Sequence, residues 1–155
     1  MRTIISPGRI KYIREEKQTT GCVLCAESAR EADLVLYEGK TCYVIMNKYP
    51  YTAGHIMIVP YRHLGSLTHL SQDEKHELID LADKAVDALQ KAFNPEGFNI
   101  GMNLGKAAGA GVDQHLHLHV VPRWVGDTNY ITVLGDARII PEEIEKTRDI
   151  LLKYF

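Results

Sequence analysis

The sequence predicts an α+β domain with a largely antiparallel sheet of five strands, one long central helix and a second helix near the C-terminus. Two observations predict this class. Short apolar runs both precede and follow a single long amphipathic stretch, and strands and helices do not alternate regularly. A length of 155 residues suits one domain of ordinary size. We therefore expect residues 1–155 to form a single domain, with residues 1–20 as an N-terminal arm.

Five short runs rich in apolar and β-branched residues are the expected strands. Turn sequences that contain glycine or proline separate the first three runs, which favours antiparallel hairpins. The expected strands are 34–37, 41–47, 55–59, 98–104 and 115–121.

The long helix is predicted by its start signal and its periodicity. Ser71 and Glu74 have the spacing of a capping box, and the apolar residues that follow recur every three or four positions. Asn94-Pro95 ends this helix, and Pro141 begins the last one. The apolar positions of the long helix are Leu78, Leu81, Ala82, Ala85, Leu89 and Phe93.

Charge and composition exclude several classes of partner. Lys and Arg number 18 against 20 Asp and Glu, so no broad cationic surface is available for nucleic acid or anionic membranes. No apolar run approaches the roughly 20 residues of a membrane span, and residues 1–17 lack the apolar core of a signal peptide. Three cysteines do not make an even disulfide framework. We expect a cytoplasmic protein that binds a small molecule.

Histidine alternates with an apolar residue through the run 115–121. Because alternate side chains of a strand share a face, His115, His117 and His119 should line one side while the residues between them face the core. Two chemistries fit such a face. The imidazoles could hold a catalytic Zn²⁺ that activates water, or a neutral imidazole could itself attack an electrophile and form a covalent intermediate.

A glycine-rich loop at residues 105–111 lies directly before the histidines. Such a loop can bring backbone N–H groups close to an anion such as phosphate. It is not a Walker loop, because no Gly-Lys-Ser or Gly-Lys-Thr ends it and a strand follows it. A flexible hairpin connection is the alternative interpretation, and the position beside the histidines favours phosphate binding.

With these residues the chain resembles the histidine triad (HIT) family, whose signature His-φ-His-φ-His-φ-φ, with φ apolar, is complete at 115–121. The resemblance extends through Asn47-Lys48-Tyr49-Pro50, residues 54–60, Asn103-Leu104-Gly105 and Pro122-Arg123-Trp124, and covers roughly residues 22–155. The stretch 122–132 looks most like the dinucleoside polyphosphate branch, especially the bacterial diadenosine tetraphosphate phosphorylases.

The resemblance implies a nucleotide hydrolase or phosphorylase with three catalytic histidines. His117 would attack the α-phosphorus of a dinucleoside polyphosphate and form a nucleotidyl-histidine intermediate, which water or phosphate then releases. His119 would contact the phosphate or the leaving group, and His55 would lie in the same group of imidazoles.

The resemblance also implies a substrate-binding set. Asn47 matches the position that contacts the ribose hydroxyls, and Asn103 with the loop backbone would hold phosphate oxygens. Relatives usually place Gln or Ser three or four positions before the first histidine, where this chain has Gly111 and Val112. The backbone would then replace that side-chain donor. The expected loop residues are Gly105, Gly109, Ala110 and Gly111.

Cys22 and Cys25 form a C-x-x-C pair, which by itself fits either a redox pair or half of a zinc site. In bacterial members of the family with such a pair, the histidine after the Val-Pro strand end and the first triad histidine complete a tetrahedral site. Those positions are His63 and His115 here. The resemblance therefore implies a closed, structural zinc site.

Further expectations concern the partners. The resemblance implies binding of a purine nucleotide or dinucleoside polyphosphate, and a homodimer whose sheet extends across two subunits. Three alternative functions remain open at this stage: a purine nucleoside phosphoramidate (AMP-amine) hydrolase, a nucleotide-binding regulator with little turnover, and a zinc hydrolase that uses all three triad histidines.

Overall fold

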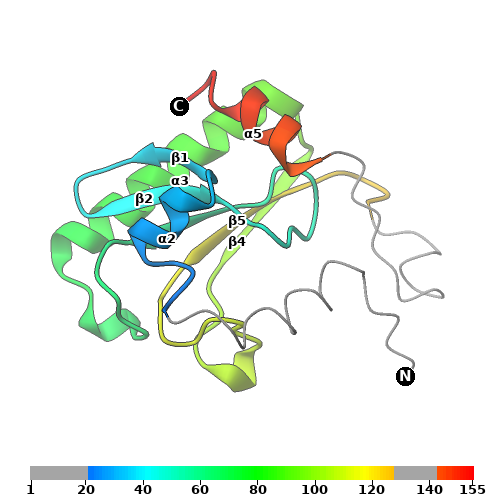
Figure 1. Ribbon diagram of the computed structural model, residues 1–155. Helices are drawn as coiled ribbons and strands as arrows, with labels where there is room; N and C mark the ends of the chain where they lie inside the picture. Colours follow the sequence, from blue (N-terminus) through cyan, green and yellow to red (C-terminus); the bar gives the residue numbers. More distant parts are fainter. Residues whose placement is uncertain (1–20, 128–142) are drawn as a thin grey trace.

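Five antiparallel strands form one sheet in the order β1-β2-β3-β5-β4. A computed structural model describes residues 21–127 and 143–155 (Figure 1). The expected N-terminal arm, Pro141 and the last residues of the stretch 122–132 lie outside these ranges. The strands are β1 (Val35–Glu38), β2 (Cys42–Met46), β3 (Ile56–Pro60), β4 (Gly97–Gly101) and β5 (Leu118–Arg123).

Three α-helices accompany the sheet: α2 (Ala26–Glu31), α3 (Gln72–Phe93) and α5 (Ile144–Leu151). Ser71 and Glu74 form the predicted capping box at the start of α3, and Asn94 ends the helix in the left-handed conformation. The predicted fold class, with its long helix and C-terminal helix, is confirmed. Two short 3₁₀ helices, η1 (Leu67–His69) and η2 (Lys106–Ala108), complete the described elements.

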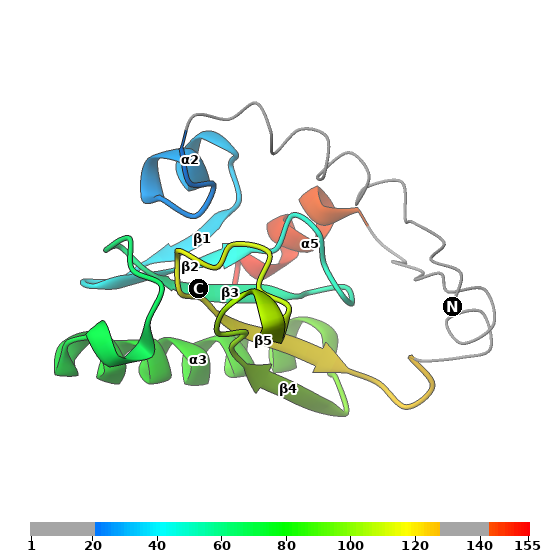
Figure 2. The ribbon, with the colours of Figure 1, turned by 90° about the horizontal axis from the view of Figure 1, so that it is seen from below.

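Both faces of the central strands are covered, since α2 and α3 lie on opposite sides of the sheet (Figure 2). Alternate residues of β2 therefore enter two cores. Val44 packs in the larger core against α3, and Tyr43 packs in the smaller core with residues of α2. Every residue of β2 and β3 is buried for this reason.

The last strand begins three residues later than the sequence predicts. The ladder between β3 and β5 ends at the pair Ile58 and Leu118. Beyond it, the N–H of Leu116 donates to the carbonyl of Leu64 instead of to a β3 residue. His115 and His117 therefore lie in the segment before β5, and only His119 lies within the strand.

Strand β4 ends at Gly101, three residues before the end that the sequence predicts, because its ladder with β5 stops at the pair Gly101 and His119. Short helices are a further difference. Helix α2 has only six residues and no side-chain hydrogen bond at its N-cap, Cys25. The sequence accordingly contains no start signal for it. Among the helices in the described ranges, none combines the length and apolar character that crossing a bilayer requires.

Candidate functional site

His55 and His119, two of the expected catalytic histidines, lie on the face of the sheet opposite α3. His119 pairs with Met57 on β3 and with Gly101 on β4. Cross-strand partners point to the same face, and Met57 packs in the smaller core on the side of α2. His55 directly precedes β3 and is fully buried. The register thus brings together two histidines that are 64 positions apart.

Hydrogen bonds fix the tautomers of His55 and His119. The backbone N–H of Tyr51 donates to Nδ1 of His55 over 3.0 Å, so this nitrogen carries no proton. The proton of the neutral His55 ring then lies on Nε2, which donates to Nδ1 of His119 over 2.9 Å. His119 in turn carries its proton on Nε2. The backbone N–H of Tyr51, the ring of His55 and the ring of His119 therefore form a chain of hydrogen-bond donors that ends at Nε2–H of His119.

That terminal Nε2 of His119 is shielded from solvent and has no hydrogen-bond partner among the described residues. Burial, together with the nearby His117, lowers the pKa of His119 to about 4. His119 is consequently neutral at pH 7. A buried donor without an acceptor carries a free-energy cost, which an anionic oxygen of a ligand would relieve.

His117 has the opposite tautomer. Its Nδ1–H donates to the backbone carbonyl of His115 over 2.8 Å, which leaves the lone pair on Nε2. Burial lowers the pKa of His117 against the opposing effect of this hydrogen bond, so the ring is neutral at pH 7. The rings of His117 and His119 meet edge to face with centroids 4.8 Å apart. A nucleophilic nitrogen and an N–H donor therefore belong to adjacent rings.

One expected substrate-binding residue, Asn47, lies beside this group of histidines. The side-chain carbonyl of Asn47 accepts the N–H of Tyr49, and its amide nitrogen lies 3.3 Å from the ring nitrogens of His55. Asn103 follows Gly101, the β4 partner of His119, by two residues along the chain. Asn47 thus has a second role, which the sequence did not indicate, in holding His55.

The glycine-rich loop lies where β4 ends, at the side of the sheet away from α5 (Figure 1). Gly105 and Gly109 have positive φ angles of 81° and 88°, conformations that favour glycine. The N–H groups of Gly109 and Ala110 donate to carbonyls within the loop, around the 3₁₀ turn. Gly105 and Gly111 are the remaining expected phosphate-binding positions of this loop.

The structure assigns His115 to a separate cluster with Cys22, Cys25 and His63. The candidate ligand atoms of all four residues lie within 4.8 Å of one another. Nδ1 of His115 is 3.4 Å from Sγ of Cys22, and Nδ1 of His63 is 3.5 Å from Sγ of Cys25. These four residues could hold a metal ion. Within the described ranges this group includes neither His117 nor His119, which argues against a metal bound by all three triad histidines.

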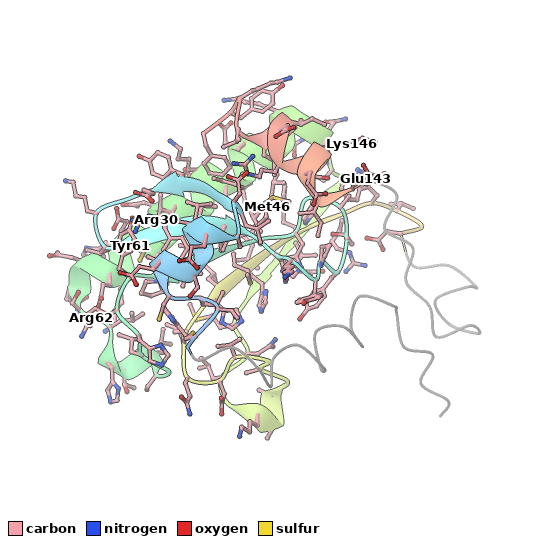
Figure 3. All side chains as sticks on the ribbon, in the orientation of Figure 1. Arg30, Met46, Tyr61, Arg62, Glu143 and Lys146 are labelled. Carbon is pink, nitrogen blue, oxygen red and sulfur yellow. The ribbon has the colours of Figure 1, made fainter. Side chains whose placement is uncertain are left out.

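A hydrogen bond orients His115 in this cluster, and an ion pair lies next to His63 in the chain. Nε2–H of His115 donates to the carbonyl of Pro60, so the lone pair on Nδ1 faces the cysteines. Arg62, which is labelled in Figure 3 and precedes His63, donates to both carboxylate oxygens of Glu74 at 2.7 and 2.6 Å, at the first turn of α3. A cavity of about 390 Å³ adjoins the cluster, lined by residues 21–23, His63 and 111–114.

Comparison with known proteins matches residues 29–125, more than half of the chain, to the HIT domain. The chain belongs to the HIT family. One relative in this family is the AP-4-A phosphorylase of Mycobacterium tuberculosis, which is 45% identical over 121 residues. The match covers 78% of this chain and 62% of the relative, so the chain spans less than two thirds of the relative's length.

Two further HIT proteins extend the comparison. The Schizosaccharomyces pombe bis(5'-nucleosyl)-tetraphosphatase (asymmetrical) is 27% identical over 121 residues, covering 78% of this chain and 63% of the relative. Among solved structures, a Zn-bound histidine triad family protein from Mycobacterium smegmatis superposes with a TM-score of 0.70 and 29% identity, covering 86% of this chain and 92% of the other.

Proposed function

We propose that this HIT protein cleaves dinucleoside polyphosphates of the diadenosine tetraphosphate type at the α-phosphate. The observation that carries the proposal is the pair of opposed tautomers: a lone pair on Nε2 of His117 beside an N–H on Nε2 of His119. A nucleophile and a donor for a developing charge are the two groups that phosphoryl transfer through a covalent intermediate needs. The named activities of the two enzyme relatives support the same substrate class.

The reaction proceeds in two displacements. Nε2 of His117 attacks the α-phosphorus, a P–N bond forms, and the P–O bond to the departing phosphate chain breaks. Nε2–H of His119 donates to an oxygen of the phosphate or of the leaving group. Water or inorganic phosphate then attacks the same phosphorus, breaks the P–N bond and restores His117.

Substrate contacts follow from the residues around the histidines. Asn47 binds the ribose hydroxyls, and Asn103 binds phosphate oxygens beside His117. The backbone at Gly105, Gly109, Ala110 and Gly111 forms the phosphate loop. Because Gly109 and Ala110 already donate within the loop, the N–H groups of Gly105 and Gly111 carry most of the phosphate contacts.

We also propose that the ion at Cys22, Cys25, His63 and His115 is zinc. Two thiolates and two imidazoles are the donor set of closed tetrahedral zinc sites, and such a site supplies folding energy rather than reaction chemistry. The Zn-bound relative from M. smegmatis supports this identity. His63→Ala should abolish bound zinc and lower Tm, whereas His69→Ala, an exposed histidine outside the cluster, should change neither. Equal zinc content in both variants would reject the site.

We further propose that the protein is a homodimer and that it is located in the cytoplasm. Residues 1–155 form one HIT domain that pairs as a homodimer, with β4 as the edge strand available for extending the sheet. The thiols of Cys22 and Cys25 bind metal only in their reduced state, so the cytoplasm is the compartment that suits this protein.

Product analysis tests the function. The protein is incubated with diadenosine tetraphosphate, with and without inorganic phosphate, and the products are separated by chromatography and identified by mass spectrometry. ADP plus ATP formed only with phosphate defines a phosphorylase, and AMP plus ATP in either buffer defines a hydrolase. No product in both buffers would reject the proposed activity and direct attention to AMP-amines or to a binding role.

A further inference from the structure

Tyr51 contacts both members of the His55–His119 pair. It lies in the turn between β2 and β3, and its ring centroid is 4.5 Å from that of His55 and 5.7 Å from that of His119. Its own backbone N–H is the donor to Nδ1 of His55. One residue thus fixes the tautomer of His55 through its backbone and packs on both imidazoles through its side chain.

The exposed fractions of the three side chains show that Tyr51 lies nearer to solvent than the histidine pair does. His55 is 0% exposed and His119 is 8% exposed, whereas Tyr51 itself is 39% exposed. Its ring therefore forms part of the boundary between the histidine pair and solvent. The cross-strand neighbours of His119, Met57 and Gly101, carry no titratable group. Among residues 21–127 and 143–155, the titratable side chains in ring contact with His119 are His55, His117 and Tyr51.

Water at this boundary would change the chemistry of the pair. Exposure to water lets an imidazole take up a proton near its ordinary pKa of about 6.5. Protonation at Nδ1 of His119 would remove the acceptor for Nε2–H of His55, because a protonated nitrogen has no lone pair. The donor chain that ends at Nε2–H of His119 would then be broken.

We propose that Tyr51 is a positioning residue whose ring excludes water from the His55–His119 pair and so preserves the proton arrangement that directs Nε2–H of His119 toward the substrate. The effect of Tyr51 on catalysis rests on the proposed function. Its effect on the protonation state of His119 does not depend on turnover. A ring that is part exposed also offers a surface for stacking a nucleobase, and the experiment separates the two roles.

The test compares wild type with Tyr51→Ala, Tyr51→Phe and a control, Tyr154→Ala, which removes a comparably exposed tyrosine near the C-terminus. Histidine pKa values and tautomers are measured residue by residue from ¹H–¹⁵N NMR spectra of the folded proteins. Tyr51→Ala should raise the pKa of His119 by about one pH unit or more. Tyr51→Phe retains the ring and should keep the wild-type pKa, as should the control.

Turnover of diadenosine tetraphosphate gives the second readout. If the pKa of His119 approaches 6.5, kcat/KM of Tyr51→Ala should fall about tenfold at pH 5.5 relative to wild type and recover at pH 8, with the loss in kcat. An unchanged pKa of His119 in Tyr51→Ala would overturn the proposal. A rise in KM alone at every pH would also overturn it and assign the ring to base stacking. If wild type has no turnover, the proposed function fails while the NMR result still decides the role of Tyr51.

Discussion

At the scale of single residues, His117 and His119 differ only in where their protons lie. Nδ1–H of His117 donates to the backbone carbonyl of His115, whereas Nδ1 of His119 accepts a hydrogen bond from His55. Two adjacent histidines thereby have opposite tautomers, which suit the proposed roles of His117 as nucleophile and His119 as donor. A backbone acceptor at His117 and a side-chain donor at His119, rather than residue type, set the two tautomers.

Removing the nucleophile should abolish turnover and preserve the fold. His117→Ala should lower kcat for dinucleoside polyphosphate cleavage by at least about a thousandfold, because loss of a covalent nucleophile leaves only binding and electrostatic contributions. Steady-state kinetics measure this loss, and far-UV circular dichroism checks the fold. His76→Ala, which removes an exposed histidine of α3, serves as the control and should retain full activity. Wild-type turnover in His117→Ala would contradict covalent catalysis by this residue.

The buried histidines should also make stability depend on pH. The pKa of His119 is about 4 in the folded protein and about 6.5 when unfolded, so between these values the unfolded state binds more protons. Stability is complete above pH 6.5 and falls as pH drops toward 4, by up to about 3 kcal/mol from this group. Urea unfolding at pH 7.5 and 5 should show a weaker pH dependence in His119→Gln. The same dependence in both proteins would refute this assignment.

At the scale of elements, Glu77 joins α3 to the turn between β1 and β2. Its carboxylate accepts the backbone N–H groups of Lys40 and Cys42 at 2.7 and 3.1 Å, and both the N–H and the hydroxyl of Thr41. A Cβ on Gly39 would lie 2.5 Å from the same carboxylate, so only glycine leaves it room. This contact anchors the first hairpin of the sheet on the long helix.

Glu77→Gln should therefore destabilise the protein by about 1–3 kcal/mol, because the amide group of glutamine cannot accept all of these donors. The free energy of unfolding in urea measures the effect. Asp80→Asn removes a charge from an exposed position of the same helix and should cost little. Equal costs for the two substitutions would show that charge alone, and not the hydrogen bonds of Glu77, matters.

Local signals predict some elements better than others. The capping box at Ser71 and Glu74 and the periodicity behind it correctly predict α3, because the start signal is local and the helix is long. The sequence does not predict α2 or η2, since both are short and neither has a side-chain cap. It predicts the start of β5 three residues too early, because a long-range hydrogen bond, from the N–H of Leu116 to the carbonyl of Leu64, ends the ladder.

In the candidate site, too, the sequence predicts some features and long-range contacts determine the others. Alternation predicts that histidines share a face, and the family resemblance places His63 and His115 beside the cysteine pair, where the structure brings them together. The tautomers and the role of Tyr51 depend on backbone groups, whose positions no residue type encodes. Sequence thus indicates which side chains meet, and the fold decides which atoms face one another.

At the scale of the whole molecule, β4 is an edge strand with exposed apolar side chains. Ile100 lies within it and Leu104 follows it, and both are about half exposed. Edge strands with apolar residues pair readily with other strands. Light scattering should therefore find a dimer for wild type and a monomer for Ile100→Lys, whereas Ile79→Lys, on the exposed side of α3, should stay dimeric. A monomeric wild type would contradict the proposed assembly.

In the proposed mechanism, His117 holds the nucleotide covalently between the two displacements. The most direct measurement is mass spectrometry of the protein quenched in alkaline denaturant during turnover of diadenosine tetraphosphate, followed by peptide mapping. We expect an adenylyl group on the imidazole of His117 and none in His117→Ala. Turnover without any adduct, or an adduct on another residue, would contradict covalent catalysis by His117.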